Sequence, residues 1–323
     1  MLRFIRAAGC VVLAMLATAA SAQTYPSGPV KLIVPIPAGG VTDVMARVIG
    51  QRLQEMWGQP VVVENRPGGN SAVGAQAVER APADGLTLLV APDATFTANP
   101  ALFSKLTYDP DGFTPIAVLC RGTPMLIVHP SLPVKTLDEF VNYAKSRPGQ
   151  LLYGSTGNGS PGHLNGEVFA KLVGIKAVHV PYRVGGQGTT DLLVGRIHFW
   201  LAQIPTRLEQ VRNGQLRALA VAGSERSADL PDIPTVKELG YGDFDASSTY
   251  ALFAPTGLPS DVISKLYDEI KSALGDEDVV KKLRAAGLEP KLMDSAQVTK
   301  VLQDQIVRWA QVVKAANIKI TGQ

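Results

Sequence analysis

The sequence predicts an α/β protein, because short β-branched runs alternate with helical patterns along most of the chain. A strand-like run from Val30 to Ile36 is followed by a glycine turn and by apolar residues at helical spacing from Val41 to Trp57. A second glycine-rich turn follows another strand-like run near 151–153. The chain has 323 residues, of which 46% are hydrophobic, so we expect large cores, two domains and mostly parallel sheet.

The other expected elements follow at short intervals. Apolar and β-branched runs indicate strands, and apolar residues three or four positions apart indicate helices. Further strands are expected at 61–63, 86–90, 125–128, 178–180, 196–201 and 217–222. Further helices are expected at 72–80, 137–145, 161–173 and 191–194. After 251–253 the pattern is helical to the C-terminus.

The N-terminus has the three parts of a secretory signal. Arg3 and Arg6 precede an apolar run, and Ala20-Ser21-Ala22 supplies the small residues that signal peptidase reads. A membrane anchor is the alternative, but it needs about 20 apolar residues, and only about 16 residues lie between Arg6 and Gln23. We therefore expect residues 1–22 to be removed and the mature chain to be exported and soluble.

Charge and cysteine content exclude two classes of protein. Loss of Arg3 and Arg6 with the signal lowers the formal net charge from +3 to +1, so no strongly basic face is available for nucleic acid. Cys10 leaves with the signal, and Cys120 alone cannot form an internal disulfide. Stability must therefore come from packing.

Two glycine-rich turns, each between a strand and a helix, point to an anion site. The first is residues 37–43 and the second is residues 154–160. Helix N-termini present unpaired N–H groups and partial positive charge, and ligands of open α/β sheets bind outside the carboxyl ends of strands. The turns lie about 115 residues apart. That spacing suits two domains that each contribute one turn.

The second turn leaves three interpretations open. Gly157, Gly159 and Gly162 match the G-x-G-x-x-G pattern of dinucleotide sites, but the next strand ends at 179–182 without the carboxylate that would hold a ribose. Ser160 followed by Pro161 is a strong helix start and allows a purely structural turn. The short polar side chains of the turn suit a small carboxylate.

The chain as a whole resembles the Bug-type extracytoplasmic solute receptors, the substrate-binding components of tripartite tricarboxylate transporters. The resemblance covers nearly all of the mature chain, in order. It rests on the stretches YPSGPVKLIVPIPAGGVTDVMAR, VVVENRPGG, ANPALFSKLTYDP, YGSTGNGSPGHLNGEVF, HVPYRVGGQGTTDLLVGRIHF, LPDIPTVKELG and WAQVVKAANIKI.

This resemblance implies a periplasmic-binding-protein-like fold of two α/β domains joined by crossing strands, with Venus-flytrap closure. Domain 1 would comprise residues 23–124 plus 245–323, and domain 2 residues 125–244. The ligand would be a small organic acid held between the two turns, and the partners would be the permease subunits of the transporter. We expect a periplasmic monomer without a cofactor, a metal or a nucleic-acid partner.

The expected ligand-binding residues lie mainly in the two turns. They are Ala38, Gly39, Gly40, Thr42, Asp43, Thr95, Ser155, Thr156, Gly157, Asn158, Ser160, His163, Tyr182 and Gln203. A carboxylate at Asp43 would repel an acid, so we interpret it as ordering the turn, or as only a helix cap. His163 either donates to a ligand or lies on a helix surface without a role. Tyr182 either lies near the ligand or belongs to the core.

Two stretches depart from the common family pattern. Ala202-Gln203 replaces an Asp-Asn pair, which leaves Gln203 as a neutral contact. Asp93 would favour an amino acid if it faces the cleft, and otherwise it is a solvated turn residue. Phe96 and Trp200 either stack on an aromatic acid or pack in the core.

Two other function classes stay open. The serine-rich turn has no G-x-S-x-G motif and the four histidines lack metal-site spacing, so we do not expect an enzyme. A Ser-His-Asp arrangement whose members come together only in the folded chain would leave no such sequence motif. A receptor that presents its ligand to a signalling partner is the second alternative.

Overall fold

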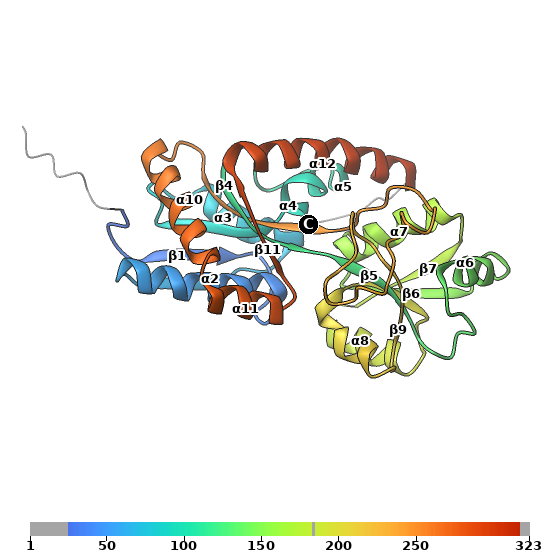
Figure 1. Ribbon diagram of the computed structural model, residues 1–323. Coiled ribbons are helices and arrows are strands. Elements are labelled where there is room, and N and C mark those ends of the chain that lie inside the picture. Colours follow the sequence, from blue (N-terminus) through green and yellow to red (C-terminus); the bar gives the residue numbers. More distant parts are fainter. Residues whose placement is uncertain (1–24, 183–184, 317–323) are drawn as a thin grey trace, which may run out of the picture.

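The computed structural model describes residues 25–182 and 185–316. In this part of the chain the strands form a six-stranded and a five-stranded sheet, each flanked by helices (Figure 1). The predicted α/β class is confirmed. The predicted signal, residues 1–22, lies outside the described residues, and none of the helices within them is long and apolar enough to cross a membrane.

The first sheet has the strand order β11-β4-β10-β3-β1-β2. Its strands are β1 (Val30–Val34), β2 (Val61–Asn65), β3 (Thr87–Pro92), β4 (Phe113–Gly122), β10 (Ser248–Pro255) and β11 (Glu289–Asp294). β1, β2 and β3 run parallel, so their carboxyl ends lie at one edge of the sheet. β10 pairs antiparallel with β3 and β4, and β11 pairs antiparallel with β4.

Successive residues of β1 face opposite sides of this sheet, as strand geometry requires. Leu32 and Val34 join one core with α2, α10 and α11, whereas Ile33 joins a second core with α3 and α12. The helices of this part are α2 (Val41–Trp57), η1 (Gly69–Ser71), α3 (Ala72–Glu79), α4 (Ala94–Thr97), α5 (Asn99–Leu102), α10 (Ser260–Leu274), α11 (Glu277–Ala285) and α12 (Ser295–Ala316).

The second sheet has the strand order β7-β6-β8-β5-β9. Its strands are β5 (Pro124–Val128), β6 (Leu151–Ser155), β7 (Ala177–Pro181), β8 (Phe199–Gln203) and β9 (Arg217–Val221), and its helices are α6 (Leu137–Lys145), α7 (Pro161–Val173), α8 (Gly185–Leu193), η2 (Ile204–Thr206) and α9 (Leu208–Arg212). Phe199 and Leu201 face the core with α6 and α7, and Trp200 faces the core with α8.

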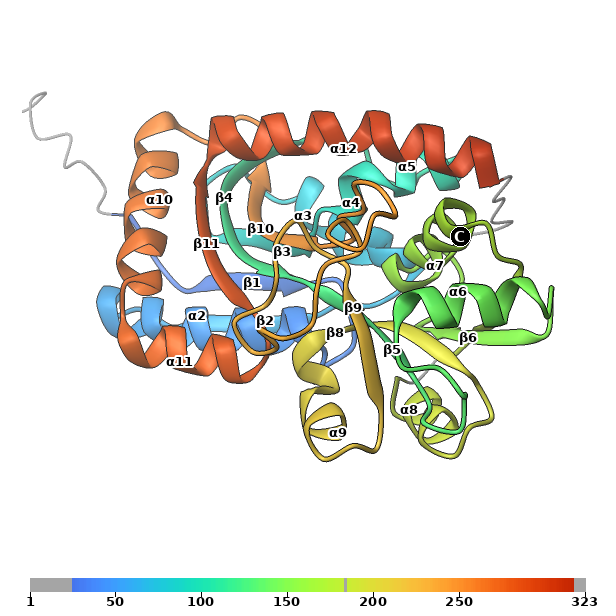
Figure 2. The same ribbon diagram turned by 45° about the vertical axis from the view of Figure 1, so that its right-hand side comes forward.

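The chain passes between the sheets twice. It leaves the first sheet at the end of β4 and enters the second at β5, and it returns between β9 and β10. The long helix α12 runs along the first sheet and reaches α7 of the second (Figure 2). There Trp309 and Val313 pack with Leu102 and Leu164. Sheet membership is compatible with the expected domain limits, which stay a prediction.

Two expectations about the sheets are wrong. Sheet pairing is not mostly parallel, because β10, β4, β11, β5 and β9 all pair antiparallel. The segment after 253 is not wholly helical, since β11 interrupts it. β11 lies at the sheet edge, contains Pro290 and has no buried residue, so it lacks the apolar run that marks inner strands.

Candidate functional site

Two edges formed by the carboxyl ends of parallel strands meet between the sheets. β1, β2 and β3 end at one edge, and β6, β7 and β8 end at the other. The edges are joined where Asn70 Nδ2 donates a hydrogen bond to the Gly159 carbonyl oxygen at 3.3 Å. Since ligands of α/β sheets bind outside the carboxyl ends of strands, the loops at these edges form the candidate site.

The first loop, residues 37–43, presents the N-terminus of α2. Gly39 has φ +81°, a left-handed conformation that glycine adopts without strain, and both Ala38 and Gly39 are exposed. Gly40 is the N-cap and makes no side-chain cap. Within the described residues, the backbone N–H groups of Val41, Thr42 and Asp43 have no hydrogen-bond acceptor. These donors are available to an anion.

The buried side chain of Asp43 orders this loop. Its carboxylate is buried and accepts the Gly39 N–H at 2.9 Å and Asn65 Nδ2 at 2.9 Å, and it pairs with Arg47 at 3.0 Å. Burial raises the pKa of Asp43, but the hydrogen bonds from Arg47, Gly39 and Asn65 together hold it below its ordinary value. Asp43 therefore stays ionised as a structural group. Both of its oxygens are occupied by protein donors, and neighbouring Thr42 is also buried.

In the second loop, residues 154–160, two expected ligand contacts serve the loop itself. The Ser155 hydroxyl is buried, accepts the Gly157 N–H at 3.1 Å and lies 2.6 Å from His179 Nε2. Ser160 caps α7 by accepting the His163 N–H at 3.3 Å. Thr156 and Asn158 are exposed, and their backbone N–H groups have no acceptor among the described residues. The free donors of this loop are therefore mainly those of Thr156 and Asn158.

Two histidines support the second loop. The rings of His163 and His179 stack with centroids 3.9 Å apart, and His163 Nδ1 accepts the Gly159 N–H at 3.0 Å. Burial lowers the pKa of both groups, to about 4 for His179, where the neighbouring His163 lowers it further. Both rings are therefore neutral at pH 7. Because Nδ1 of His163 accepts, its proton sits on Nε2, which leaves a donor.

The other predicted contacts divide into two groups. Tyr182 is buried, and its hydroxyl donates to Asp191 at 2.9 Å, which places it in the core. Thr95 and Gln203 each carry a buried side-chain oxygen, Oγ1 and Oε1, without a partner among the described residues. Buried polar atoms are normally paired, so these two oxygens are candidates for contact with a ligand or water.

Of the open alternatives, burial excludes a solvated turn position for Asp93 and confirms core packing for Phe96 and Trp200. Asp93 is buried, so it is not a solvated turn residue, and it accepts the Thr249 N–H at 3.2 Å. Burial raises its pKa to about 6. Asp93 lines a small cavity together with Arg308, and the Arg308 guanidinium would compete with a ligand ammonium for the Asp93 carboxylate. Phe96 and Trp200 are both buried within aromatic packing.

Sequence reasoning missed the turn at 68–71 as part of the site. Gly68, Gly69, Asn70 and Ser71 all have positive φ, and Asn70 makes the hydrogen bond to Gly159 of the second loop. Positive φ at two non-glycine residues indicates a conformation that the surroundings impose. The turn stands between β2 and α3, so it has the same strand, glycine turn and helix pattern as the other two loops.

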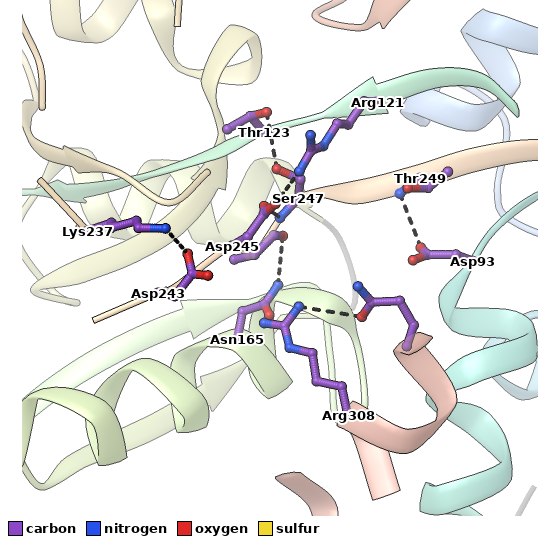
Figure 3. A network of polar contacts seen from close by, with 12 residues as sticks. Asp93, Arg121, Thr123, Asn165, Lys237, Asp243, Asp245, Ser247, Thr249 and Arg308 are labelled. Atoms are coloured by element: carbon purple, nitrogen blue, oxygen red, sulfur yellow. Dashed lines mark hydrogen bonds and ion pairs between the residues drawn. The ribbon is translucent and has the colours of Figure 1, made fainter. Parts of the chain in front are cut away.

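A separate polar network surrounds the crossing segments (Figure 3). Arg121 of β4 pairs with Asp245, and Asn165 Nδ2 of α7 donates to the Ala246 carbonyl oxygen at 3.1 Å. A cavity of about 200 Å³ beside this network is lined by Arg121, Asp245, Ser247, Thr249, Lys291 and Gln305, among others. None of the predicted ligand-binding residues lines it. In the described part of the chain, no group of three His, Cys, Asp or Glu could hold a metal.

Two sheets with facing strand ends, each presenting a helix N-terminus, define a bilobal binding protein. The family model described as "Tripartite tricarboxylate transporter family receptor" matches residues 45–318. The chain belongs to this family, which confirms the resemblance seen in the sequence. It is a periplasmic solute-binding protein of a receptor family and not an enzyme.

Individual relatives agree with this assignment. BugT of Bordetella pertussis is 36% identical over 312 residues, with 96% of each chain covered. The structure of R. palustris Rpa4515 with adipate is 33% identical, covers 92% of this chain and 100% of its own, and has a TM-score of 0.83. MatC of Rhodopseudomonas palustris with bound malate is 32% identical, covers 90% and 100%, and has a TM-score of 0.78.

Proposed function

We propose that this receptor binds a small organic acid in a cleft between the first and second loops and delivers it to the membrane subunits of a tripartite tricarboxylate-type transporter. One observation carries the proposal. Two helix N-termini, from different sheets and at facing strand ends, present N–H groups without acceptors among the described residues. The acids bound by Rpa4515 and MatC, adipate and malate, support a carboxylate as the ligand.

The residues divide into donors and supports. Backbone N–H groups of Thr42 and Asp43 in the first loop, and of Thr156 and Asn158 in the second, hold the carboxylate, with the His163 Nε2–H as a further donor. Asp43, Ser155 and Ser160 keep these groups in place. Ala38, Gly39, Gly40 and Gly157 allow the acid to approach the backbone closely, and Thr95 and Gln203 contact the remainder of the ligand.

Binding is coupled to closure of two domains, residues 23–124 plus 245–323 and residues 125–244. A carboxylate that satisfies donors on both loops favours the closed arrangement, because a ligand shifts an equilibrium by its difference in affinity for the two states. The mature protein acts as a monomer in the periplasm after removal of residues 1–22. Small-angle scattering with and without saturating acid should show a smaller radius of gyration with ligand, and an unchanged radius on a sample with confirmed binding contradicts closure.

A thermal-shift screen of mono-, di- and tricarboxylates tests the ligand class. An acid at 100 times its dissociation constant stabilises the fold by about 2.7 kcal/mol when it binds only the native state. A response to carboxylates but not to matched amides is expected. Absence of any response to acids contradicts the proposal, and deletion of the gene without loss of acid uptake contradicts delivery to a transporter.

A further inference from the structure

Arg207 lies at the same edge of the second sheet as the second loop. β8 runs parallel to β6 and ends at Gln203, and Arg207 follows after η2. The second loop begins at the end of β6, which is the neighbour of β8 in the sheet. The two segments therefore leave adjacent strands at their carboxyl ends, where the proposed acid is bound.

The Arg207 side chain is held on a rigid platform. Its guanidinium carbon lies 6.0 Å from the Trp200 ring centroid, and the guanidinium donates to the Thr206 carbonyl oxygen and to Thr189 Oγ1. The indole is itself wedged against Gly154, where an added Cβ would lie 2.4 Å from Trp200 Cε3. Because Gly154 directly precedes Ser155, the indole connects the guanidinium to the start of the second loop.

No acidic side chain in the described part of the chain pairs with Arg207. None of the ion pairs found among the described residues includes it. Its Nε is buried and has no hydrogen-bond partner among those residues. Burial lowers its pKa, yet an arginine stays protonated near neutral pH. Buried charges are normally paired, so an unpaired, half-buried guanidinium at a ligand-binding edge calls for an anion.

We propose that Arg207 holds a second carboxylate of the ligand, so that this receptor selects dicarboxylates over monocarboxylates. The inference rests on the proposed function, in which the two loops hold the first carboxylate. A guanidinium binds a carboxylate through two parallel N–H donors, which gives both strength and a fixed orientation. A monocarboxylate uses the loop donors alone and leaves Arg207 without an anion.

Calorimetric titration of the mature protein with acids matched in length tests this. Succinate is compared with butyrate, and adipate with hexanoate, for the wild type, Arg207→Gln, Arg207→Lys and the control Arg212→Gln. Arg212 lies close by on α9 and is exposed; it pairs with the Asp229 carboxylate at 3.8 Å and donates to the Asp229 carbonyl oxygen at 3.3 Å. We expect Arg207→Gln to weaken binding of at least one diacid about 10- to 100-fold, as for loss of a charge-assisted contact. Monoacid binding should change less than about 3-fold and Arg212→Gln should resemble the wild type.

The outcomes separate this inference from the proposed function. If Arg207→Gln changes diacid and monoacid binding equally, or neither, Arg207 is not a carboxylate subsite, while acid binding by the wild type still supports the function. If the wild type binds no acid, both fail. Arg207→Lys keeps the charge but loses the planar fork and should retain an intermediate diacid preference. If Arg207→Gln does not fold, Arg207→Lys decides instead. Undiminished diacid affinity in that variant contradicts binding of the second carboxylate by two guanidinium donors.

Discussion

The first loop is shaped by a buried anion and the second by a neutral imidazole. In the first, ionised Asp43 accepts the Gly39 N–H, and in the second, uncharged His163 accepts the Gly159 N–H. Both acceptors stand four residues after the N–H that they hold, so each loop closes onto the first turn of its own helix. The difference shows that a loop at a helix N-terminus can be ordered either by an ionised carboxylate or by a neutral imidazole.

The largest expected effect comes from blocking either loop. Gly39→Val and Gly157→Val place a side chain at φ +81° and +124°, beside the donors of each loop. We expect binding of the acid to fall more than about 100-fold in each, since several charge-assisted hydrogen bonds are obstructed together. Gly214→Val is the matched control, because Gly214 has φ +75° and open space around it outside the loops. Equal loss of affinity in all three would show that backbone strain alone is responsible.

Removing the buried carboxylate of Asp43 should destabilise the protein more than removing an exposed carboxylate. Asp43→Ala leaves the Gly39 N–H, Asn65 and Arg47 without their acceptor, and we expect a loss of about 2 to 3 kcal/mol in the free energy of unfolding. Urea denaturation measures it. Asp304→Ala, which removes an exposed pair with Lys300, should change stability by less than about 0.5 kcal/mol. A similar small change for Asp43→Ala would refute its ordering role.

Acidification should affect the second loop first, through His163 and His179. A pKa lowered in the folded state gives stability that is present above the ordinary value of 6.5 and is lost as pH falls, here toward about 4 for His179. The urea midpoint should therefore fall between pH 6.5 and 4, and less so in His179→Gln. Asp43 keeps its charge until the pH falls below its ordinary value of 3.8.

Protonation of Asp93 should partly offset this loss of stability at low pH, which provides a check on the prediction. Its pKa is raised to about 6 by burial, so its contribution to stability is fully present below 3.8 and is lost as pH rises through 6. Asp93→Asn should make the acid-induced fall steeper than in the wild type. Buffers without carboxylates are needed, because acetate or citrate could occupy the site. An unchanged pH profile in both variants would contradict the assignment of these shifts.

The smallest effect is expected at the crossing segments, outside both loops. The Arg121 and Asp245 side chains are each 31% exposed, so their ion pair should contribute about 1 kcal/mol or less. A double-mutant cycle with Arg121→Met and Asp245→Asn measures this coupling by urea denaturation. Acid affinity should be unchanged in both single variants, and a large loss of affinity would move the site toward the crossing segments.

Local sequence patterns predicted the elements next to the site, and long-range contacts were beyond them. Ser160-Pro161 predicted the start of α7, which the structure confirms with Ser160 as N-cap. The pairing of Asp43 with Asn65 joins residues 22 positions apart, and Asn70 reaches Gly159 across the two sheets. Such contacts depend on the strand order, which hydrophobic periodicity does not specify. The residues assigned to the ligand stay a prediction.

A crystal structure of the protein with a bound dicarboxylate tests the central claim most directly. The account predicts one carboxylate within hydrogen-bond distance of backbone N–H groups from both loops, at Thr42 or Asp43 and at Thr156 or Asn158. An acid held by one loop alone, or bound in the cavity lined by Arg121 and Lys291, would contradict it.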